Sequence, residues 1–88
     1  MGIQLTIHIF KDGRGFVAHA LELDVSSCGS TKEKALENLK VAVRLFMEES
    51  EKIGTLQQIL EEAGYRKNGN QIAGREFVSV QRVSLPFH

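Results

Sequence analysis

The sequence predicts an α+β fold in which one long helix packs on one face of a mixed sheet of about four strands. Three observations predict this class. Apolar and polar residues alternate near the start, apolar residues recur three and four apart from about residue 32 to residue 52, and apolar residues accumulate again after residue 76. Alternation is typical of a strand with one apolar face, and the longer period is typical of an amphipathic helix. The predicted order is β-β-β-α-(α)-β.

The first three predicted strands form a meander. The alternating series that indicates the first strand is Ile3, Leu5, Ile7 and Ile9. Gly13 and Gly15 then supply the positive φ angles that a hairpin turn needs. The return strand is expected from Phe16 to Leu21, and a short third strand from Val25 to Gly29.

The register of this hairpin decides what each face of the sheet carries. We expect Phe10 to pair with Phe16, which leaves both rings on the face away from the helix. The same register places Ile7 opposite His19, so His8 and His19 lie on opposite faces and are not expected to form a metal pair or an acid–base pair. An apolar face on a small sheet favours association with a second copy.

The first helix is predicted from about Lys32 to about Lys52. Ser30 is the expected cap because Glu33 follows three residues later at capping-box spacing, and Thr31 is a rival cap. The apolar stripe expected to face the sheet consists of Leu36, Leu39, Val43, Phe46 and Ile53, widened by Ala35 and Ala42.

A short second helix is predicted after Gly54, which ends the first helix. Thr55 with Gln58 three residues later repeats the capping-box spacing, and Gly64 closes this helix. The segment from Arg66 to Arg75 is rich in glycine and asparagine, so it is predicted as a loop with room for a small hairpin.

A last strand is predicted from Phe77 to Leu85. Its apolar pattern changes phase near Gln81, because Val78 and Val80 share one phase whereas Val83, Leu85 and Phe87 share the other. A β-bulge explains this change, and so does a strand that is buried on both faces. Pro86 ends the strand, since proline has no backbone N–H to donate.

Size and charge bound the class of protein. The 88 residues are expected to form one domain, residues 1–88, with a small core. Eleven basic and eleven acidic residues give a net charge of zero, which argues against a dedicated nucleic-acid binder. Residues 65–88, however, carry four basic residues against one acidic residue. The alternative function is therefore a small nucleic-acid-binding accessory protein that uses this basic C-terminal segment.

Cysteine content and hydropathy indicate the compartment. Cys28 is the single cysteine, so no disulfide forms within the chain, and a cytoplasmic location is expected. No apolar run approaches the roughly 20 residues of a membrane span, so no membrane partner is expected. Cys28 lacks a histidine or a second cysteine at metal-binding spacing, and a small buried side chain is the favoured interpretation.

Three short pieces of the chain, taken in order, carry a resemblance to a known family. They are Asp12-Gly13 with Gly15-Phe16-Val17-Ala18, then Glu22-Leu23, then Gly29-Ser30-Thr31 with Ala35-Leu36-Glu37-Asn38-Leu39. These pieces resemble the hairpin, the strand end and the helix start of the HicB-like family, the antitoxin half of HicA–HicB toxin–antitoxin pairs. The resemblance covers residues 3 to about 53. The chain departs from the family between Leu23 and the helix, where Pro-Gly-Cys is usual.

The resemblance implies both a fold and a function. The family domain is a degenerate RNase H-like fold, with the first strand central and the strand after the helix parallel to it. An antitoxin of this type binds and neutralises a HicA-like RNA-cleaving toxin by steric masking. Full-length antitoxins of the family typically add a DNA-binding domain, and no separate DNA-binding domain is expected here. A homo-oligomer, most simply a dimer, is the expected assembly.

No enzymatic activity is expected. An RNase H enzyme needs clustered carboxylates for two metal ions, and the first predicted strand offers only Gln4, Thr6 and His8 between its apolar residues. The nearby acidic residues, Glu22, Asp24 and Glu37, are scattered, and Ser26-Ser27 lacks a base. The sequence therefore predicts no catalytic, cofactor-binding or metal-ligating residues and no cofactor.

Four basic residues are the remaining candidates for contact with phosphate. Lys40 and Arg44 lie four apart on the outside of the predicted first helix. Arg75 and Arg82 join them only if the fold brings the C-terminal segment near the helix. A solvated face is the favoured interpretation.

Overall fold

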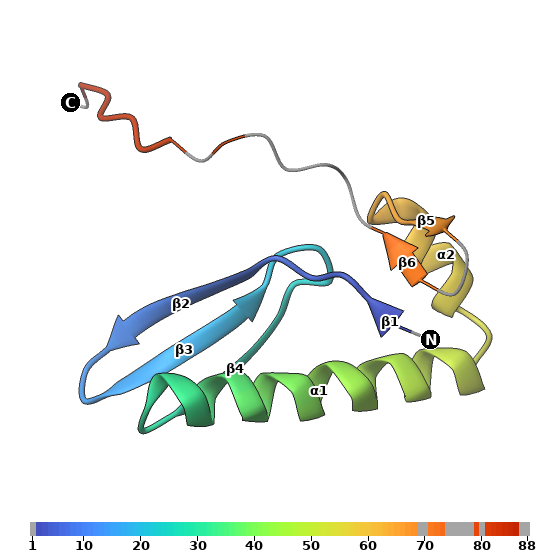
Figure 1. Cartoon of the computed structure of the whole chain (residues 1–88), viewed down its shortest axis with the longest axis horizontal. Helices are drawn as coiled ribbons and strands as arrows, with labels where there is room; N and C mark the ends of the chain where they lie inside the picture. Colours follow the sequence, from blue (N-terminus) through green and yellow to red (C-terminus); the bar gives the residue numbers. More distant parts are fainter. Residues whose placement is uncertain (1, 69–70, 74–78, 80, 87–88) are drawn as a thin grey trace.

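The computed structural model describes residues 2–68, 71–73, 79 and 81–86, and it belongs to the α+β class (Figure 1). Side chains are described for residues 3–65, 79 and 81–86. The elements in chain order are β1 (Gly2–Ile3), β2 (Ile7–Asp12), β3 (Gly15–Ala20), β4 (Val25–Gly29), α1 (Lys32–Lys52), α2 (Leu56–Glu62), β5 (Arg66–Asn68) and β6 (Gln71–Ala73).

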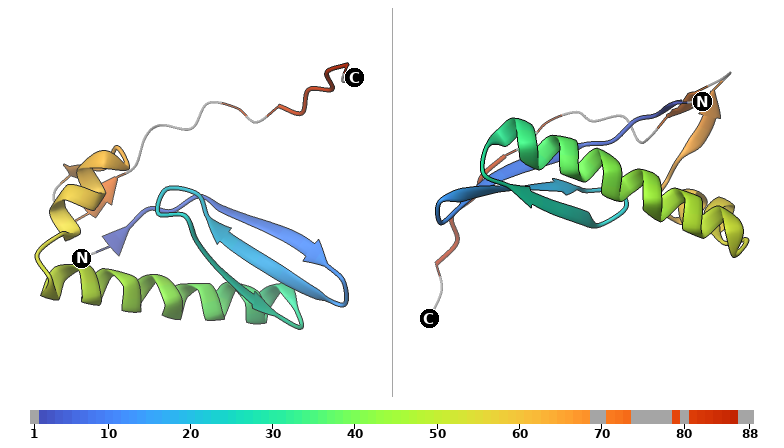
Figure 2. Two further views of the ribbon diagram at one scale, coloured as in Figure 1. Left: turned by 180° about the vertical axis from the view of Figure 1, so that it is seen from behind. Right: turned by 90° about the horizontal axis from the view of Figure 1, so that it is seen from below.

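The main sheet is a three-stranded antiparallel meander in the order β2-β3-β4. The long helix α1 lies across one face of this sheet, as the view from below in Figure 2 shows. Within the described residues the central strand is β3, so the central first strand that the family resemblance implies is not confirmed. A second, small sheet in the order β1-β6-β5 lies with α2 near the C-terminal end of α1 (Figure 1).

The hairpin register differs by one residue from the predicted one. Phe10 pairs with Val17, not with Phe16, because Gly13 and Arg14 form a two-residue turn between Asp12 and Gly15. Gly13 has φ 59°, a conformation that glycine adopts without the steric penalty of a side chain. The shift moves Phe16 to the helix side of the sheet, where it packs against the core, and leaves Phe10 on the open face.

The helix α1 is capped by Thr31, the rival cap, and not by the expected cap, Ser30. Thr31 has extended backbone angles, and its Oγ1 accepts a hydrogen bond of 3.0 Å from the backbone N–H of Lys34. This bond satisfies one of the amide groups that the first helical turn leaves free. The predicted helix end is confirmed, because Gly54 follows Lys52 closely with a left-handed φ of 78°.

The core lies between β3, β4 and the first half of α1. Its buried apolar members in the described part of the chain are Ala18, Ala20, Leu23, Ala35, Leu39, Val43 and Tyr65. Most of the predicted helical stripe is confirmed, since Ala35, Leu39 and Val43 are buried and Phe46 packs beside them. Ile53 is 66% exposed, so its assignment to the stripe is wrong. Ile53 caps the C-terminus of the helix and lies beyond the last packed turn.

Close packing of α1 on β4 requires a glycine at residue 29. A Cβ atom added to Gly29 would lie 2.5 Å from the backbone N of Ala35 and 2.7 Å from the carbonyl carbon of Lys34. Both atoms belong to the helix backbone, so a side chain here forces the helix away from the strand. One residue before Gly29, the carbonyl oxygen of Cys28 accepts a 2.8 Å hydrogen bond from Nδ2 of Asn38. These contacts fix the start of α1 against the sheet.

The second helix and the hairpin after it follow the prediction in outline. Gly64 has φ 88° and closes α2, and β5 and β6 form the small hairpin for which the loop has room. The predicted capping box of α2 is absent, because the Thr55 side chain makes no capping bond and instead donates to the Ser50 carbonyl at 3.4 Å. That bond joins α2 to the last turns of α1.

The predicted last strand is not confirmed. Residues 77, 78 and 80 lie outside the described residues, and residues 79 and 81–86 belong to no strand. In Figure 1 residues 81–86 lie far from α1, at the end of the chain. Val83 and Leu85 are 71% and 79% exposed there.

Candidate functional site

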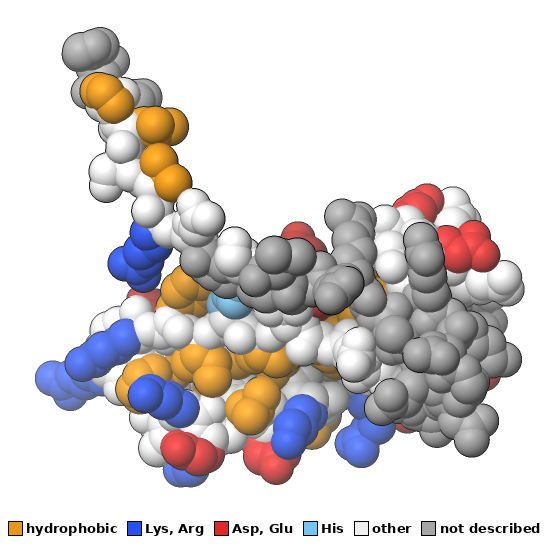
Figure 3. Space-filling view, turned by 45° about the horizontal axis from the view of Figure 1, so that its top comes forward, with side chains coloured by type: hydrophobic (Ala, Val, Ile, Leu, Met, Phe, Trp, Pro, Cys, Tyr) orange, Lys and Arg blue, Asp and Glu red, His pale blue; other side chains and the backbone are white. Residues whose placement is uncertain are grey.

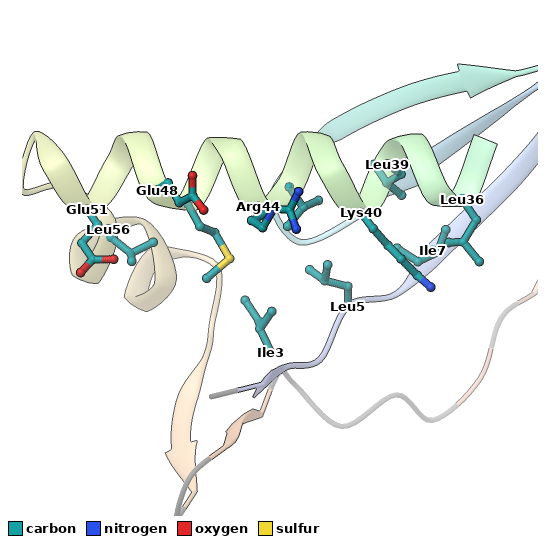
Figure 4. Close-up of a pocket in the computed structure, with 12 residues that line it drawn as sticks. Ile3, Leu5, Ile7, Leu36, Leu39, Lys40, Arg44, Glu48, Glu51 and Leu56 are labelled. Carbon is teal, nitrogen blue, oxygen red and sulfur yellow. The ribbon is translucent and has the colours of Figure 1, made fainter. Parts of the chain in front are cut away.

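A groove of about 540 Å³ lies between α1 and the N-terminal segment of the chain. Its apolar lining consists of Ile3, Leu5, Ile7, Leu36, Leu39, Val43, Met47 and Leu56. Figure 4 shows the Ile3 and Leu5 side chains pointing across the groove toward the helix. In the space-filling view of Figure 3, hydrophobic side chains form a band that is bordered by basic and acidic groups. The sequence pattern does not indicate this groove, because it predicts an uninterrupted strand where the groove wall lies.

The wall of the groove is formed where the predicted first strand is interrupted. Residues 4–6 belong to neither β1 nor β2, although their alternation is that of a strand. The carboxylate of Glu22 replaces the missing strand partner: it accepts hydrogen bonds from the backbone N–H of Thr6 at 2.8 Å and from the Thr6 hydroxyl at 2.7 Å. The Thr6 carbonyl in turn accepts a 2.9 Å bond from the backbone N–H of Leu21. These three bonds hold the N-terminal segment beside the second strand of the hairpin.

Tyr65 fixes the same segment from its other side. Its hydroxyl donates a 2.6 Å hydrogen bond to the carbonyl oxygen of Gln4, across 61 positions of the chain. Burial raises the pKa of the Tyr65 hydroxyl to about 12, and the negative charge of Glu22 adds to this effect. The hydroxyl is therefore protonated, and able to donate this bond, throughout the neutral range. Glu22 and Tyr65 together position the groove wall, and the only sequence signal for either is the Glu-Leu piece that resembles HicB-like proteins.

The rim of the groove on α1 carries both signs of charge. Lys40 and Arg44, the predicted candidates for phosphate contact, are exposed and line the groove, but Glu48 and Glu51 line it on the following turns. Figure 4 shows these four side chains along one side of the helix. Acidic groups at this spacing offset the basic pair. Arg75 lies outside the described residues, and the structure does not bring the exposed Arg82 to the groove.

The open face of the main sheet is a second candidate surface. The cross-strand pairs place His8 beside His19 and Phe10 beside Val17, and β4 adds Ser26 and Cys28. The prediction that the two histidines lie on opposite faces is therefore wrong, and the one-residue shift of the hairpin is the reason. The His8 and Phe10 rings meet edge to face with centroids 6.2 Å apart. Phe10 is 53% exposed, so an aromatic surface faces solvent.

Asp24 holds one of the histidines of this open face in position. It has a left-handed φ of 53° at the end of the turn between β3 and β4, a conformation that aspartate adopts more readily than most residues. Its Oδ1 lies 2.8 Å from Nε2 of His19. The bond holds the His19 ring in place on the sheet, whereas the Asp24 side chain is 93% exposed.

Cys28 is exposed on the same face, so the prediction of a buried cysteine is wrong. The register pairs it with Val17, and α1 covers the opposite side of the sheet. Within the described residues, no group of three or more His, Cys, Asp and Glu side chains is arranged to hold a metal ion. Neither α1 nor α2 has a stretch apolar enough, at sufficient length, to cross a membrane.

Comparisons with protein families, with curated proteins and with solved structures find no significant match to this chain.

Proposed function

We propose that this chain is a cytoplasmic, HicB-like interaction module that binds a HicA-like RNA-cleaving toxin and neutralises it by steric masking, with no catalytic action of its own. The toxin class comes from the resemblance of the three sequence pieces to HicB-like proteins. Each piece has a structural role that supports a shared architecture: Gly13 forms the hairpin turn, Glu22 holds the N-terminal segment, and Gly29 admits the helix.

The open face of the main sheet is the observation that carries this proposal. It presents Phe10 at 53% exposure, flanked by the His8 ring and by the shorter side chains of Val17 and Cys28. A central exposed aromatic ring within a largely uncharged surface is typical of a protein-binding site, where such rings contribute much of the affinity. A toxin bound on this face has its own active surface covered, which is all that steric masking requires.

We also propose that the functional protein is a homodimer and that its complete sheet has a fourth strand, as in the RNase H-like fold of the family. The small core supports association, and the described residues leave two apolar surfaces, the groove and the open face, uncovered. The fourth strand is expected beside β2, whose outer edge has no partner among the described strands.

The test is the binding of a HicA-like toxin to this chain, measured by calorimetry and by inhibition of the toxin's RNA cleavage. Phe10→Asp should weaken binding by about thirtyfold or more, equivalent to about 2 kcal/mol, because it places a charge where the ring is desolvated. Leu45→Asp is the matched control, since Leu45 is 57% exposed on α1, away from the open face. Equal affinity of both variants and the original protein would contradict the proposed surface.

The alternative, a nucleic-acid-binding accessory protein, has one structural observation in its favour. Lys40 and Arg44 are both exposed one turn apart, and Arg82 is exposed as well. Counterion release makes such binding fall steeply with salt. This alternative predicts RNA or DNA binding that weakens strongly between about 0.05 and 0.2 M salt. The double variant Lys40→Ala with Arg44→Ala should lose that binding. If both results are obtained and the protein binds no toxin, this alternative replaces the first proposal.

A further inference from the structure

The open face brings together two histidines whose ring nitrogens the proposed function does not use. His8 and His19 lie directly opposite one another on β2 and β3. Side chains at opposite positions of an antiparallel pair lie on the same face, with Cβ atoms about 4.5–5.5 Å apart. Imidazole is the commonest protein ligand of metal ions, and two ligands of a tetrahedral ion are about 3.3 Å apart. The pair is therefore close enough to share one ion.

Asp24 already orients one of these histidines in the way that a metal ligand is oriented. Its Oδ1 lies 2.8 Å from Nε2 of His19. An ionised carboxylate only accepts hydrogen bonds, so Nε2 carries the hydrogen and Nδ1 keeps the lone pair that can bind an ion. Metal-binding histidines almost always donate their other ring N–H to a carboxylate, a backbone carbonyl or a water molecule. His19 therefore has this outer partner without any ion.

His8 can supply the second ligand. Of the two rings, that of His19 alone forms a hydrogen bond to a described residue, so both ring nitrogens of His8 are open to an ion within the described part of the chain. The His8 ring packs edge to face against Phe10, with centroids 6.2 Å apart. Such a contact is weak beside a bond from nitrogen to a metal ion, and the ring can turn toward His19.

The charges on the open face favour a cation. The side chains of β2, β3 and β4 that lie on this face include no lysine and no arginine. Asp12 lies on the same face by its register, and Asp24 adjoins it at the end of the sheet. A cation between the two histidines therefore meets no positive side chain on the surrounding strand positions of this face.

The kind and number of ligands decide which ions the pair can hold. Within the described residues no further His, Cys, Asp or Glu side chain is arranged to complete a cluster of three, so water fills the remaining positions. Zn²⁺, Ni²⁺ and Cu²⁺ bind imidazole well, whereas Mg²⁺ and Ca²⁺ prefer oxygen ligands. The site is therefore specific for the first group of ions.

We propose that His8 and His19 together bind one divalent transition-metal ion of the class of Zn²⁺, Ni²⁺ and Cu²⁺. Asp24 is a positioning residue, which acts on the ion through the His19 ring. The inference goes beyond the proposed binding of a toxin and does not depend on it.

The first test is a calorimetric titration of the untagged chain with ZnCl₂, together with the NMR signals of the histidine rings. His8→Gln and His19→Gln should each raise the dissociation constant for zinc at least about tenfold, since loss of an outer partner alone costs about that much. MgCl₂ should not bind. His88→Gln removes the third histidine of the chain, Cys28→Ser removes the thiol on the same face, and both should leave the dissociation constant unchanged.

The assignment of the ligands is overturned by either of two results. One is zinc binding that survives both His8→Gln and His19→Gln. The other is zinc binding that is lost in His88→Gln or in Cys28→Ser.

A second test examines the positioning role of Asp24. Asp24→Gly removes the carboxylate, and glycine adopts the left-handed backbone of this residue without strain. The dissociation constant for zinc should rise about tenfold, with an unchanged circular dichroism spectrum. Asp24→Asn keeps a side-chain oxygen that accepts from Nε2 of His19, so it should recover most of the affinity. Equal zinc affinity in Asp24→Gly and the original protein would overturn this role.

Phe10→Asp separates this inference from the proposed function. The substitution should weaken toxin binding, but it keeps both histidines and should not lower the affinity for zinc. A chain that binds toxin through Phe10, and in which ZnCl₂ changes neither the heat nor the histidine signals, would overturn the metal site alone. Zinc binding that requires both histidines, in a chain that binds no toxin, would contradict the proposed function alone.

Discussion

The two halves of α1 pack in different ways. The first half lies on β3 and β4, where Ala18, Ala20 and Ala35 are fully buried and Leu39 is 1% exposed. The second half faces the N-terminal segment across the groove, which also reaches Leu36, Leu39 and Lys40 of the first half, and Met47 there is only partly covered. The helix thus has a buried contact with the sheet along its first half and an incompletely covered one along its second half.

Side-chain size accounts for this difference. Alanine and glycine on the facing strands allow the backbone of α1 to approach closely, and Leu39 then fills the remaining space. Beyond Val43 the groove separates the helix from the N-terminal segment, which is bonded to Glu22 and Tyr65. The first half therefore determines stability, and the second half is available for binding.

Truncation of matched residues in the two halves should show the largest contrast. Leu39→Ala removes a fully enclosed side chain and should lower the free energy of unfolding by about 3–5 kcal/mol. Met47→Ala acts on a side chain that already borders open space, leaves no closed cavity, and should lower it by about 1 kcal/mol. Urea unfolding of both variants measures the difference. Equal losses would mean that the groove is closed in solution.

The close approach in the first half can be tested at Gly29. Gly29→Ala places a methyl group against the backbone of α1 and should lower the free energy of unfolding by about 2–3 kcal/mol through overpacking. Ser30→Ala, next in the chain and exposed, should change it by less than about 0.5 kcal/mol. A tolerated alanine at residue 29 would show that the helix can move away from β4 without penalty.

The bonds that hold the groove wall can be removed without change to the helix. Glu22→Ala leaves the N–H of Thr6 without its acceptor and should lower the free energy of unfolding by about 2 kcal/mol. Amide hydrogen exchange should accelerate at Thr6 while the amides of β3 stay protected. Glu37→Ala, on an exposed helix position, is the control. Uniformly faster exchange in Glu22→Ala would contradict a local role.

Substitution of Tyr65 should have a smaller effect on the free energy of unfolding, and this effect should depend on pH. Tyr65→Phe removes the bond to the Gln4 carbonyl and should lower the free energy of unfolding by about 1 kcal/mol near neutral pH. Because the pKa of Tyr65 is raised from 10.0 to about 12 in the folded chain, its contribution is complete below pH 10 and is lost as the pH rises to about 12. The difference between the two proteins should therefore shrink over this range. A constant difference up to pH 12 would contradict the raised pKa.

The smallest effect is expected on the rim of the groove. Lys40 is exposed one position from Leu39, so Lys40→Ala should change the free energy of unfolding by less than about 0.5 kcal/mol. Urea unfolding beside Leu39→Ala makes the comparison direct. A loss as large as that of Leu39→Ala would mean that the helix is rotated relative to the sheet.

Local signals predicted the helices and the third strand, whereas the hairpin register needed information that the sequence does not carry locally. Asp12-Gly13-Arg14-Gly15 contains two glycines, and both a three-residue turn centred on Gly13 and a two-residue turn of Gly13 and Arg14 are compatible with them. A shift of one residue moves every side chain to the other face. For that reason the pairing of His8 with His19, and the composition of the open face, could not be obtained from the pattern.

The groove was missed for a different reason. Alternation through Ile3, Leu5, Ile7 and Ile9 predicts one continuous strand, and only Glu22 and Tyr65, distant in the sequence, show why it is interrupted. The N-cap of α1 was hard to predict for a similar reason, because Ser30 and Thr31 are both good caps. The packing of Gly29 on the helix favours Thr31.

The bond from Tyr65 to Gln4 has a consequence for the order in which the chain folds during synthesis. The hairpin strands, β4 and α1 follow one another in sequence, so their contacts require only short loops to close. The N-terminal segment, by contrast, waits for a partner 61 positions later, and closing so long a loop is slow. On a ribosome, residues near the start of the chain emerge first and reach their final position last. Until Tyr65 has left the exit tunnel, the first apolar residues of the nascent chain remain accessible to chaperones.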